Sequence, residues 1–393
     1  MPATPQSQLP NRPTVDFSSH PSEGGDKMNR YASGLLVTAM TTAPTVFAQQ
    51  PTTVKIGGQI KLGMDNVVSK SSSRASQSVS RLHNNTSFWY LDGREDLGAG
   101  LNAYFRLEWD FAADTGNWGA GRNFFVGLGH QNWGRLQLGR QSVYFSHHWP
   151  LADAHGSFDT APNAANSLNV LGSINGAYFS GGFLNNTVRY VAPSIAGFSG
   201  MASYSFDAES ANSSRNGTFY INPTYTNGPF KLGFYHMTRR AQGSLPGQTV
   251  GTLDQSANRI AAGYTAKGWQ LGLIIDRNKV TNSATQALQY RLAYAIPISY
   301  SFGPHRVSGT WGKALDTHAN GSKLDNSGAQ MLSISYQYAL SKRTLLGASF
   351  VELRNQRNGR YGFWLGGLSG MQLPVADAGG RNRMLYTGIK HVF

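Results

Sequence analysis

The fold is decided by the segment LNAYFRLEWDF, residues 101–111, in which apolar and polar side chains alternate. Its odd positions are all apolar, whereas its even positions are polar and include Arg106, Glu108 and Asp110. A repeat of two is the repeat of an extended strand, because successive side chains leave opposite faces of the chain. The segment is therefore predicted to be a strand with one oily face and one charged face.

The same alternation recurs along the chain, most clearly in residues 54–65, 288–301 and 332–338. The first two runs are longer than the typical soluble strand of about five or six residues. They reach the length of roughly ten residues with which a tilted strand crosses a bilayer. Short connectors alternate with long polar segments between the runs, and the longest segment covers about 142–185. This asymmetry is typical of an outer-membrane barrel, and counting the runs predicts about 16 strands.

The composition is that of an all-β protein. Among 393 residues there are 46 Gly, 18 Tyr, 20 Phe and 8 Trp, and there is no Cys. Without Cys the chain has no disulfide framework, thiolate zinc site or iron–sulfur cluster. After the N-terminal region, no stretch approaches the roughly 20 apolar residues of a membrane-spanning helix. We expect a fold that is held by hydrogen bonds and packing.

The net charge of +14 is the kind of excess that often indicates nucleic-acid binding. Here the basic residues are scattered through alternating strands rather than clustered, and the chain carries an export signal. Cations that face a water-filled pore explain the charge better, with outward contacts to anions or lipopolysaccharide as a second use. Nucleic acid is therefore not an expected partner.

The N-terminal region contains an export signal that begins at Met28, not at residue 1. From there the sequence MNRYASGLLVTAMTTAPTVFAQQ has a basic residue, an apolar run and small residues before Gln49. Signal peptidase accepts small side chains at such a site, which places the cut after Ala48. Residues 28–48 are predicted to be the signal peptide and residues 49–393 the barrel. We interpret residues 1–27 as an upstream extension that results from an over-extended start codon.

A closed barrel is the form in which β-structure can span hydrocarbon, because it satisfies every backbone donor and acceptor without water. The predicted fold class is therefore an all-β transmembrane antiparallel β-barrel. Its lipid side would carry the odd positions of residues 101–111, and its lumen would carry Arg106, Glu108 and Asp110. The alternative interpretation is a soluble β-sandwich with one solvated face.

The chain resembles the general trimeric porins of Gram-negative outer membranes, in the form typical of betaproteobacteria and Neisseria. The matching segments follow the family's strand order and are LDGREDLGAGLNAYFRLE (91–108), GRNFFVGLG (121–129), GRLQLGRQ (134–141) and NNTVRYVAPSIAGFSGMASYSF (185–206). The most specific matches are YQYALSKRTLLGASF (336–350) and the terminal YTGIKHVF (386–393). The resemblance implies a homotrimer of sixteen-stranded barrels in the outer membrane. It also implies that the barrel-assembly machinery recognises the C-terminal Phe393.

In this family the third long loop bends inward and narrows the pore, and here residues 142–185 are the candidate. The acidic residues of this segment are Asp153 and Asp159, and it contains no Lys or Arg. Acids on the loop and bases on the wall would create a transverse field that sorts ions by sign and size. This is the expected mechanism of selectivity.

The basic wall departs from the family pattern. In the second strand, Phe88 replaces an Arg of the family, and Tyr90 replaces the Gly that follows two residues later. Just before the sixth strand, Phe183 or Leu184 replaces another Arg of the family. Arg122 matches the Arg of the fourth strand. The expected residues of the pore lining and constriction are Arg122, Arg106, Lys61, Arg135, Arg189, Arg291, Phe88, Tyr90, Asp153 and Asp159. The preference for anions or cations stays open, since the narrow point is more aromatic and less cationic than usual.

Other chemistry has little support in the sequence. The segment SHHWPLADAH, residues 146–155, contains metal-ligand residue types, but their spacing matches no compact metal site. The segment GAGRN at 119–123 precedes no strand–loop–helix unit, and no Ser–His arrangement recommends an esterase. We expect no enzyme activity, cofactor or metal. The predicted function is a diffusion channel for small hydrophilic solutes and ions; the alternatives are a substrate-specific channel with an aromatic constriction and an adhesive barrel.

Overall fold

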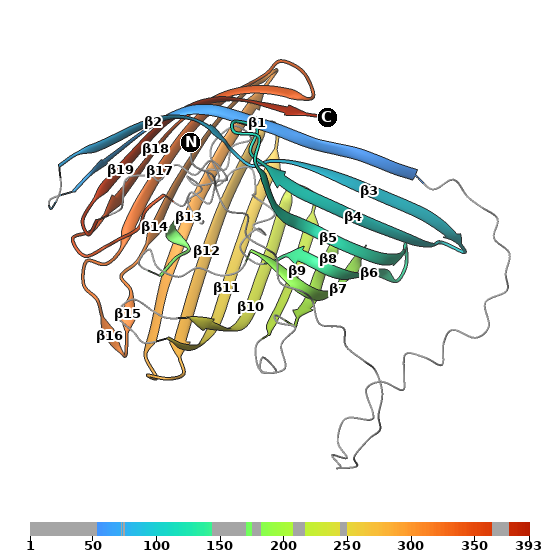
Figure 1. Cartoon of the computed structure of the whole chain (residues 1–393), viewed down its shortest axis with the longest axis horizontal. Helices are drawn as coiled ribbons and strands as arrows, with labels where there is room; N and C mark the ends of the chain where they lie inside the picture. The colour runs from blue at the N-terminus through green and yellow to red at the C-terminus, as the bar shows by residue number, and fades with distance from the viewer. Residues whose placement is uncertain are drawn as a thin grey trace, which may run out of the picture. The chain divides into compact units, whose positions relative to one another are not determined.

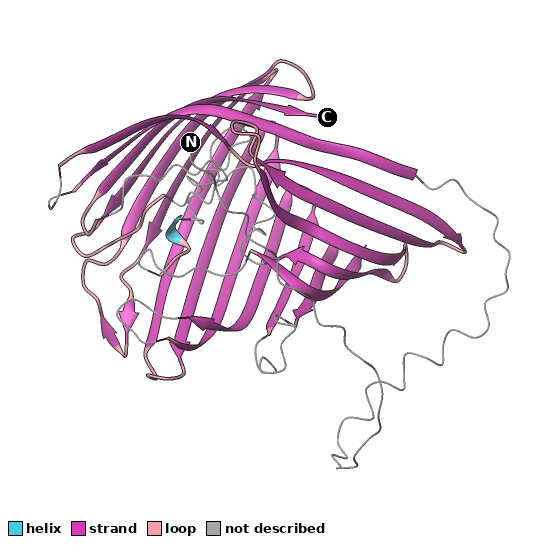
Figure 2. Cartoon of the chain, viewed as in Figure 1, coloured by secondary structure: helices cyan, strands magenta, loops and turns pink. Residues whose placement is uncertain are grey.

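The computed structural model describes residues 53–71, 73, 75–143, 170–174, 182–206, 217–243, 250–363 and 377–393, all within the compact unit Gln50–Phe393. The predicted signal peptide and upstream extension lie outside these residues. Strands account for nearly all of the regular structure that is described (Figure 2). Within the same residues, no helix is long and apolar enough to span a membrane.

The strands are joined into one sheet in which each pairing is antiparallel, and almost all neighbours in the sheet are also neighbours in sequence. Their bounds are β1 (Thr53–Lys70), β2 (Gln77–Asn84), β3 (Ser87–Gly98), β4 (Leu101–Phe111), β5 (Trp118–His130), β6 (Gly134–Ser142), β7 (Phe183–Ile195), β8 (Phe198–Ser205), β9 (Thr218–Asn227), β10 (Phe230–Gly243), β11 (Gly251–Ala266), β12 (Trp269–Asn282), β13 (Leu288–Phe302), β14 (His305–Ala314), β15 (His318–Ala319), β16 (Ser322–Lys323), β17 (Ala329–Ala339), β18 (Thr344–Asn355) and β19 (Arg381–Val392).

The sheet closes on itself because the last strand pairs with the first. The register of β1 and β19 runs from Gln59 opposite Val392 to Lys70 opposite Arg381. In Figure 1 the blue β1 accordingly lies beside the red strands at the end of the chain. Closure leaves the sheet without a free edge, so its backbone groups are paired within the wall. The predicted transmembrane-type barrel is confirmed.

The strand labels reduce to sixteen wall strands. β1 pairs with β2 along its second half and with β3 along its first half, so β2 and β3 are two parts of one wall strand. They are separated near Thr86, whose φ of 67° interrupts the extended backbone. β15 and β16 form a short hairpin within the connection from β14 to β17, which pair directly with each other. The prediction of about 16 strands is therefore correct.

The two faces of the wall differ as the alternation predicts. In β17 the side chains of Met331, Ser333 and Ser335 are buried, whereas Leu332 and Ile334 are exposed. Buried residues of this parity pack across the inside of the barrel, so the exposed aliphatic side chains face outward. An outward apolar surface is the surface that contacts lipid acyl chains.

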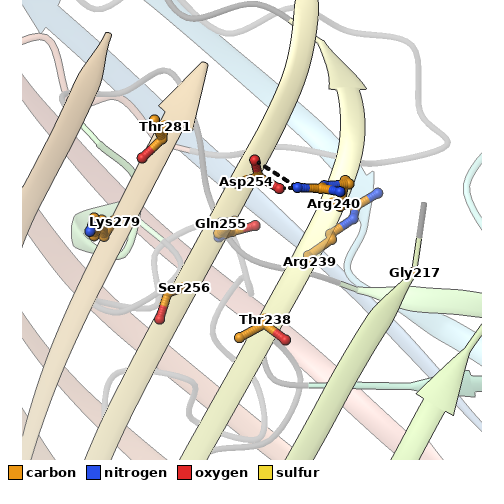
Figure 3. Close-up of a pocket in the computed structure, with 9 residues that line it drawn as sticks. All are labelled: Gly217, Thr238, Arg239, Arg240, Asp254, Gln255, Ser256, Lys279 and Thr281. Carbon is orange, nitrogen blue, oxygen red and sulfur yellow. Dashed lines mark hydrogen bonds and ion pairs between the residues drawn. The ribbon is translucent and has the colours of Figure 1, made fainter. Parts of the chain in front are cut away.

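The apolar outer surface gives way to polar side chains near the long loops. On β10, β11 and β12, outward positions form two neighbouring rows (Figure 3). The first row is Thr238, Ser256 and Lys279, and the second is Arg240, Asp254 and Thr281. The next row toward the short turns contains His236, Asn258 and Arg277, and beyond it the outward positions become apolar with Phe234, Ile260 and Ile275. This change locates one boundary of the lipid-facing band.

The connections follow the predicted asymmetry. Short turns join β3 to β4, β5 to β6, β7 to β8, β9 to β10, β11 to β12, β13 to β14 and β17 to β18, and the longer connections lie at the other ends of the strands. The longest connection runs from β6 to β7. Asp153 and Asp159 fall in its part that lies outside the described residues, so the inward bend of the whole loop stays a prediction.

Residues 170–174 of this connection are described, and they lie on the inner face of the wall. Val170 and Leu171 are buried in one cluster with Met331, Leu353 and Met384, which are inward residues of β17, β18 and β19. Tyr361 and Phe363, from the last long connection, belong to the same cluster. Apolar side chains from two loops therefore occupy part of the interior.

Candidate pore constriction

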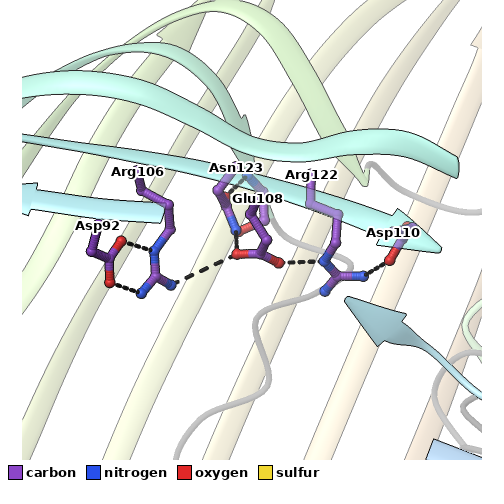
Figure 4. Close-up of polar contacts among 7 residues, drawn as sticks. Asp92, Arg106, Glu108, Asp110, Arg122 and Asn123 are labelled. Atoms are coloured by element: carbon purple, nitrogen blue, oxygen red, sulfur yellow. Dashed lines mark hydrogen bonds and ion pairs between the residues drawn. The ribbon is translucent and has the colours of Figure 1, made fainter. Parts of the chain in front are cut away.

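A ladder of charged side chains crosses the inner face of β3, β4 and β5 (Figure 4). Arg106 donates to both carboxylate oxygens of Asp92, with Nε at 2.7 Å and Nη2 at 2.6 Å. Nη1 of Arg106 lies 3.7 Å from Oε2 of Glu108. Glu108 also accepts a hydrogen bond from Nε of Arg122, whose Nη1 lies 3.0 Å from Oδ1 of Asp110. Acid and base thus alternate along the ladder, which places opposite charges next to each other throughout.

Aromatic rings flank both arginines of the ladder. The guanidinium carbon of Arg106 lies 4.4 Å from the ring centroid of Tyr90. The guanidinium carbon of Arg122 lies 4.9 Å from the ring centroids of both Phe88 and Phe183. Such cation–π contacts are each worth about 0.5–1 kcal/mol at exposed sites and more where water is excluded. The rings hold each guanidinium in place while its donors reach the acids.

Irregularities in the strand register direct the side chains of the ladder toward one another. The pairing of β4 with β5 shifts between Leu107 and Phe111, and Asn123 next to Arg122 also reaches Glu108, with Nδ2 at 3.2 Å from Oε2. In β6 a second shift follows Gly139, whose φ of 141° suits glycine. A side chain at Gly139 would meet the carbonyl oxygen of Phe124 at 2.1 Å. A bulge changes the direction of the residues that follow it.

The second bulge brings in Arg140, which strict alternation would have directed outward with Leu136 and Leu138. Its Nε donates to the carbonyl of Gly121 at 2.7 Å, and its Nη1 donates to Oδ1 of Asn185 at 2.6 Å. Its guanidinium carbon lies 5.8 Å from the ring centroid of Phe183. Arg140 was not among the predicted site residues, and the GR pair at 139–140 is only a weak signal of a bulge.

The ladder is close to electrical balance. Arg106 and Arg122 pair with the three acids Asp92, Glu108 and Asp110, and Arg140, which bonds to Gly121 and Asn185 instead of an acid, is a third cation beside them. Because opposite charges lie in direct contact, their fields largely cancel a few ångströms away. The ion pairs therefore fix the positions of the side chains but give the wall little net electric field. The side chains of Arg106 and Arg122 are 34% and 20% exposed, so both remain accessible to water and ions.

A second inward cluster lies on β11, β12 and β13. Asp276 accepts hydrogen bonds from Nε of Arg259 at 3.1 Å and from Nη2 of Arg291 at 2.7 Å. Arg291 also donates to the carbonyls of Gly172 and Ser173, the latter at 2.8 Å from Nε. This guanidinium is fully buried and ties the described piece of the long loop to the wall. Arg259 and Asp276 were not among the predicted site residues.

The remaining predicted residues are dispersed over the inner wall. Lys61 of β1 is almost completely buried, and its backbone N–H donates to Oγ of Ser87 at 2.9 Å. Arg189 of β7 is also buried and donates through Nη2 to the carbonyl of Ser142. Arg135 of β6 is exposed near a short turn. The structure thus brings together Arg106, Arg122, Phe88 and Tyr90, and it leaves Lys61, Arg135, Arg189 and Arg291 outside that group.

No group of three His, Asp or Glu side chains among the described residues is arranged to hold a metal ion. The site offers charged and aromatic side chains along the inner wall of a closed barrel. Such an arrangement orients and sorts dissolved ions and small polar solutes. Fold and site together define a barrel-type channel protein of the outer membrane.

Comparison with known proteins specifies the family. The model of the family "Gram-negative porin" matches residues 34–358. The chain is 27% identical over 315 residues to outer membrane porin protein 32 of Delftia acidovorans, covering 77% of this chain and 83% of that one. It is 28% identical over 338 residues to the major outer membrane protein P.IA of Neisseria meningitidis serogroup B, covering 73% and 79%. The chain belongs to the Gram-negative porin family.

Solved structures agree with the fold. An anion-selective porin from Comamonas acidovorans superimposes with a TM-score of 0.72 at 23% sequence identity, covering 87% of this chain and 100% of that chain. Its similarity supports the barrel architecture. The chain is an outer-membrane porin, a passive channel and not an enzyme.

Proposed function

We propose that this porin is a general diffusion channel with weak charge selectivity, and that the ladder on β3, β4 and β5 forms one wall of its narrow region. The observation that carries the proposal is the direct pairing of Arg106 and Arg122 with Asp92, Glu108 and Asp110. A wall of paired charges offers hydrogen bonds to ions of either sign. It therefore orders solutes without strongly rejecting one sign.

The net charge of +14 does not contradict weak selectivity. Selectivity depends on the field at the narrowest point, and charges farther than about 10 Å from an ion are largely screened at 0.1 M salt. The named anion selectivity of the Comamonas acidovorans porin supports a small bias toward anions here. In this chain the acids of the ladder reduce that bias.

A substrate-specific channel is the second candidate, and the rings of Phe88, Tyr90 and Phe183 favour it. Aromatic rings in a narrow lumen can stack against planar or sugar-like solutes. Here the arginines already occupy positions against these rings at 4.4–4.9 Å. A solute would have to share or displace them, which favours the general channel.

Conductance measurements separate the two candidates. For a general channel, single-channel conductance in a planar bilayer rises linearly with salt, and sugars, amino acids and organic anions do not block it. Concentration-dependent block by one solute class would support the specific channel instead. Negligible conductance would leave an adhesive or structural barrel. The reversal potential across a salt gradient measures the sign and size of the selectivity.

The assembly partners belong to the same proposal. Aromatic rings cover the outward face of β3, β4 and β5. The ring centroids of Trp89 and Trp109 lie 4.8 Å apart in a stacked pair, and the ring centroid of Phe124 lies 4.4 Å from that of Trp109 in an edge-to-face pair. This surface supports a homotrimer contact. At the C-terminus, Phe393 exchanges backbone hydrogen bonds with Gly58 of β1, which suits a final strand that assembly machinery delivers to the closing seam. Lipopolysaccharide is the expected lipid partner.

A further inference from the structure

The outer surface near the long loops carries an arginine cluster on β18 and β19. Val351 and Leu353 are completely buried in the inner cluster, so the side chain of Glu352 between them leaves the opposite, outward face. Arg354 shares this face because it lies two residues further along the same strand. On β19, Arg383 is the direct neighbour of Glu352, and Arg381 is the direct neighbour of Arg354.

Three arginines converge on the one carboxylate. Nε of Arg383 and Nε of Arg381 each donate to Oε2 of Glu352 at 2.7 Å, and Nε of Arg354 donates to Oε1. Glu352 is 7% exposed, whereas the side chains of Arg354 and Arg383 are 57% and 45% exposed. Glu352 is bound through the Nε edge of these two arginines. Among the described residues no partner of the Nη groups of Arg354 and Arg383 is found, so these donors can reach an anion outside.

Lys70 extends the cluster across the closing seam. On β1 it lies directly opposite Arg381, so Arg354, Arg381 and Lys70 follow one another in a single row across three strands. Like charges on directly opposite positions destabilise a sheet. The cluster contains four cations and one acid, and a group of like charges that destabilises the isolated chain is typical of a functional site.

The cluster lies at the edge of the lipid-facing band. The next outward row toward the short turns contains Ile334, Phe350 and Leu385, which are exposed by 49%, 37% and 62%. The cluster is on the side of the long loops, which face the outside of the cell in outer-membrane barrels. Its guanidinium groups are thus at the level where lipid phosphates meet acyl chains.

We propose that Arg354, Arg381, Arg383 and Lys70 bind the phosphate groups of lipopolysaccharide in the outer leaflet, with its acyl chains against Phe350 and Leu385. Glu352 is a positioning residue that holds the guanidinium groups in a fixed array. The proposal deepens the lipid contact expected above and rests on the outer-membrane location of the barrel. It does not depend on the proposed selectivity of the pore.

A concave surface on β10, β11 and β12 provides a comparison with the arginine cluster, because it also lies on the outward face of the wall (Figure 3). There Arg240 donates through Nε and Nη2 to the two oxygens of Asp254, at 2.6 Å and 3.3 Å. One acid neutralises one arginine, and Arg239 and Lys279 are the other cations of the lining. This surface has the same location relative to the loops, but it lacks converging arginines.

Native mass spectrometry tests the proposal. It measures the binding of purified bis-phosphorylated lipid A to the mature barrel in detergent. The double variant Arg354→Gln/Arg383→Gln is expected to bind lipid A roughly 30-fold more weakly, because each basic side chain near a lipid surface contributes roughly fivefold to the affinity. Lipid A from which the phosphates have been removed is expected to bind the native barrel as weakly as the double variant binds intact lipid A. Lys70→Gln, which breaks no bond to Glu352, is expected to weaken binding about fivefold.

Arg240→Gln is the control and is expected to change lipid A binding less than twofold. Equal losses in the control and the double variant, or equal binding of the dephosphorylated lipid, would overturn the proposal. If the double variant does not fold, an unchanged affinity of Lys70→Gln has the same consequence. Single-channel conductance of each variant is expected to match the native value, so a failure of this site is distinguishable from a failure of the proposed pore function.

Discussion

Nη1 of Arg122 lies 3.0 Å from Oδ1 of Asp110, while Nε of the same guanidinium donates to Glu108. One cation on the inner wall is therefore shared between two acids of the neighbouring strand. Removing either partner leaves a different net charge at the same place. Substituting Arg122 or one of its acids therefore measures how this wall contributes to ion selectivity, toward cations in the first case and toward anions in the second.

Arg122→Ala is expected to shift the channel toward cations, because it leaves Glu108 with fewer donors and Asp110 without its guanidinium. One unit charge about 4 Å from an ion is worth about 1 kcal/mol in water, which corresponds to a roughly fivefold change in permeability ratio as an upper bound. The reversal potential in a salt gradient measures it. Arg135→Ala, an exposed arginine near a short turn, is the control. An unchanged reversal potential in Arg122→Ala would show that the ladder is not at the narrow point.

Glu108→Gln is expected to produce the opposite shift, toward anions and of similar size. The amide keeps the shape of the side chain but removes the charge that faces both Arg106 and Arg122. The same bilayer measurement applies, and the two single variants bracket the native channel. A shift of both variants in the same direction would contradict local charge as the cause and indicate a change of pore shape.

Arg291→Gln is expected to lower the stability of the barrel by about 3 kcal/mol, because it breaks a buried ion pair with Asp276 and leaves the carbonyls of Gly172 and Ser173 without this donor. Thermal unfolding in detergent, followed by circular dichroism, gives the change. Conductance is also expected to become noisier, since residues 170–174 lose a tie to the wall. Arg291→Lys, which keeps the charge, should recover part of the stability. Equal stability of Arg291→Gln and native protein would refute this anchor.

The mature chain is expected to begin at Gln49, because Ala48 is the predicted cleavage position. N-terminal sequencing of barrels from outer membranes reads the first residue directly. Trypsin digestion of the unprocessed precursor tests the start of translation. Detection of a peptide from residues 13–26 would show that translation begins upstream of Met28.

The strand pattern was predictable because a barrel wall has two solvents. Lipid on one side and water on the other impose alternation on each strand, and in the alternating run 332–338 the structure exposes Leu332 and Ile334 on the outward face. The wall of about sixteen strands followed from counting the alternating segments. Arg106 and Glu108 were assigned to the inner face by the same reasoning, and the structure places them there with 3.7 Å between Nη1 of Arg106 and Oε2 of Glu108.

Side-chain partnerships could not be obtained this way, because they depend on register and on bulges. Arg140 reaches the inner group only because of the irregularity after Gly139, which a strict repeat of two does not contain. The pairing of Arg259 and Asp276 requires that β11 and β12 meet in one specific register. The contacts of Asp153 and Asp159 fall outside the described residues, so the role of these acids stays a prediction.

The sequence by itself determined the class of fold and the face on which residues of the regular strand segments lie, since alternation is a local property that two different solvents enforce. Only the tertiary structure decided which charges meet. Glu352 lies between buried neighbours in sequence, yet its three arginines come from two strands that are joined by a long connection. Such meetings are set by the hydrogen-bonding register of the closed sheet, which no single strand encodes.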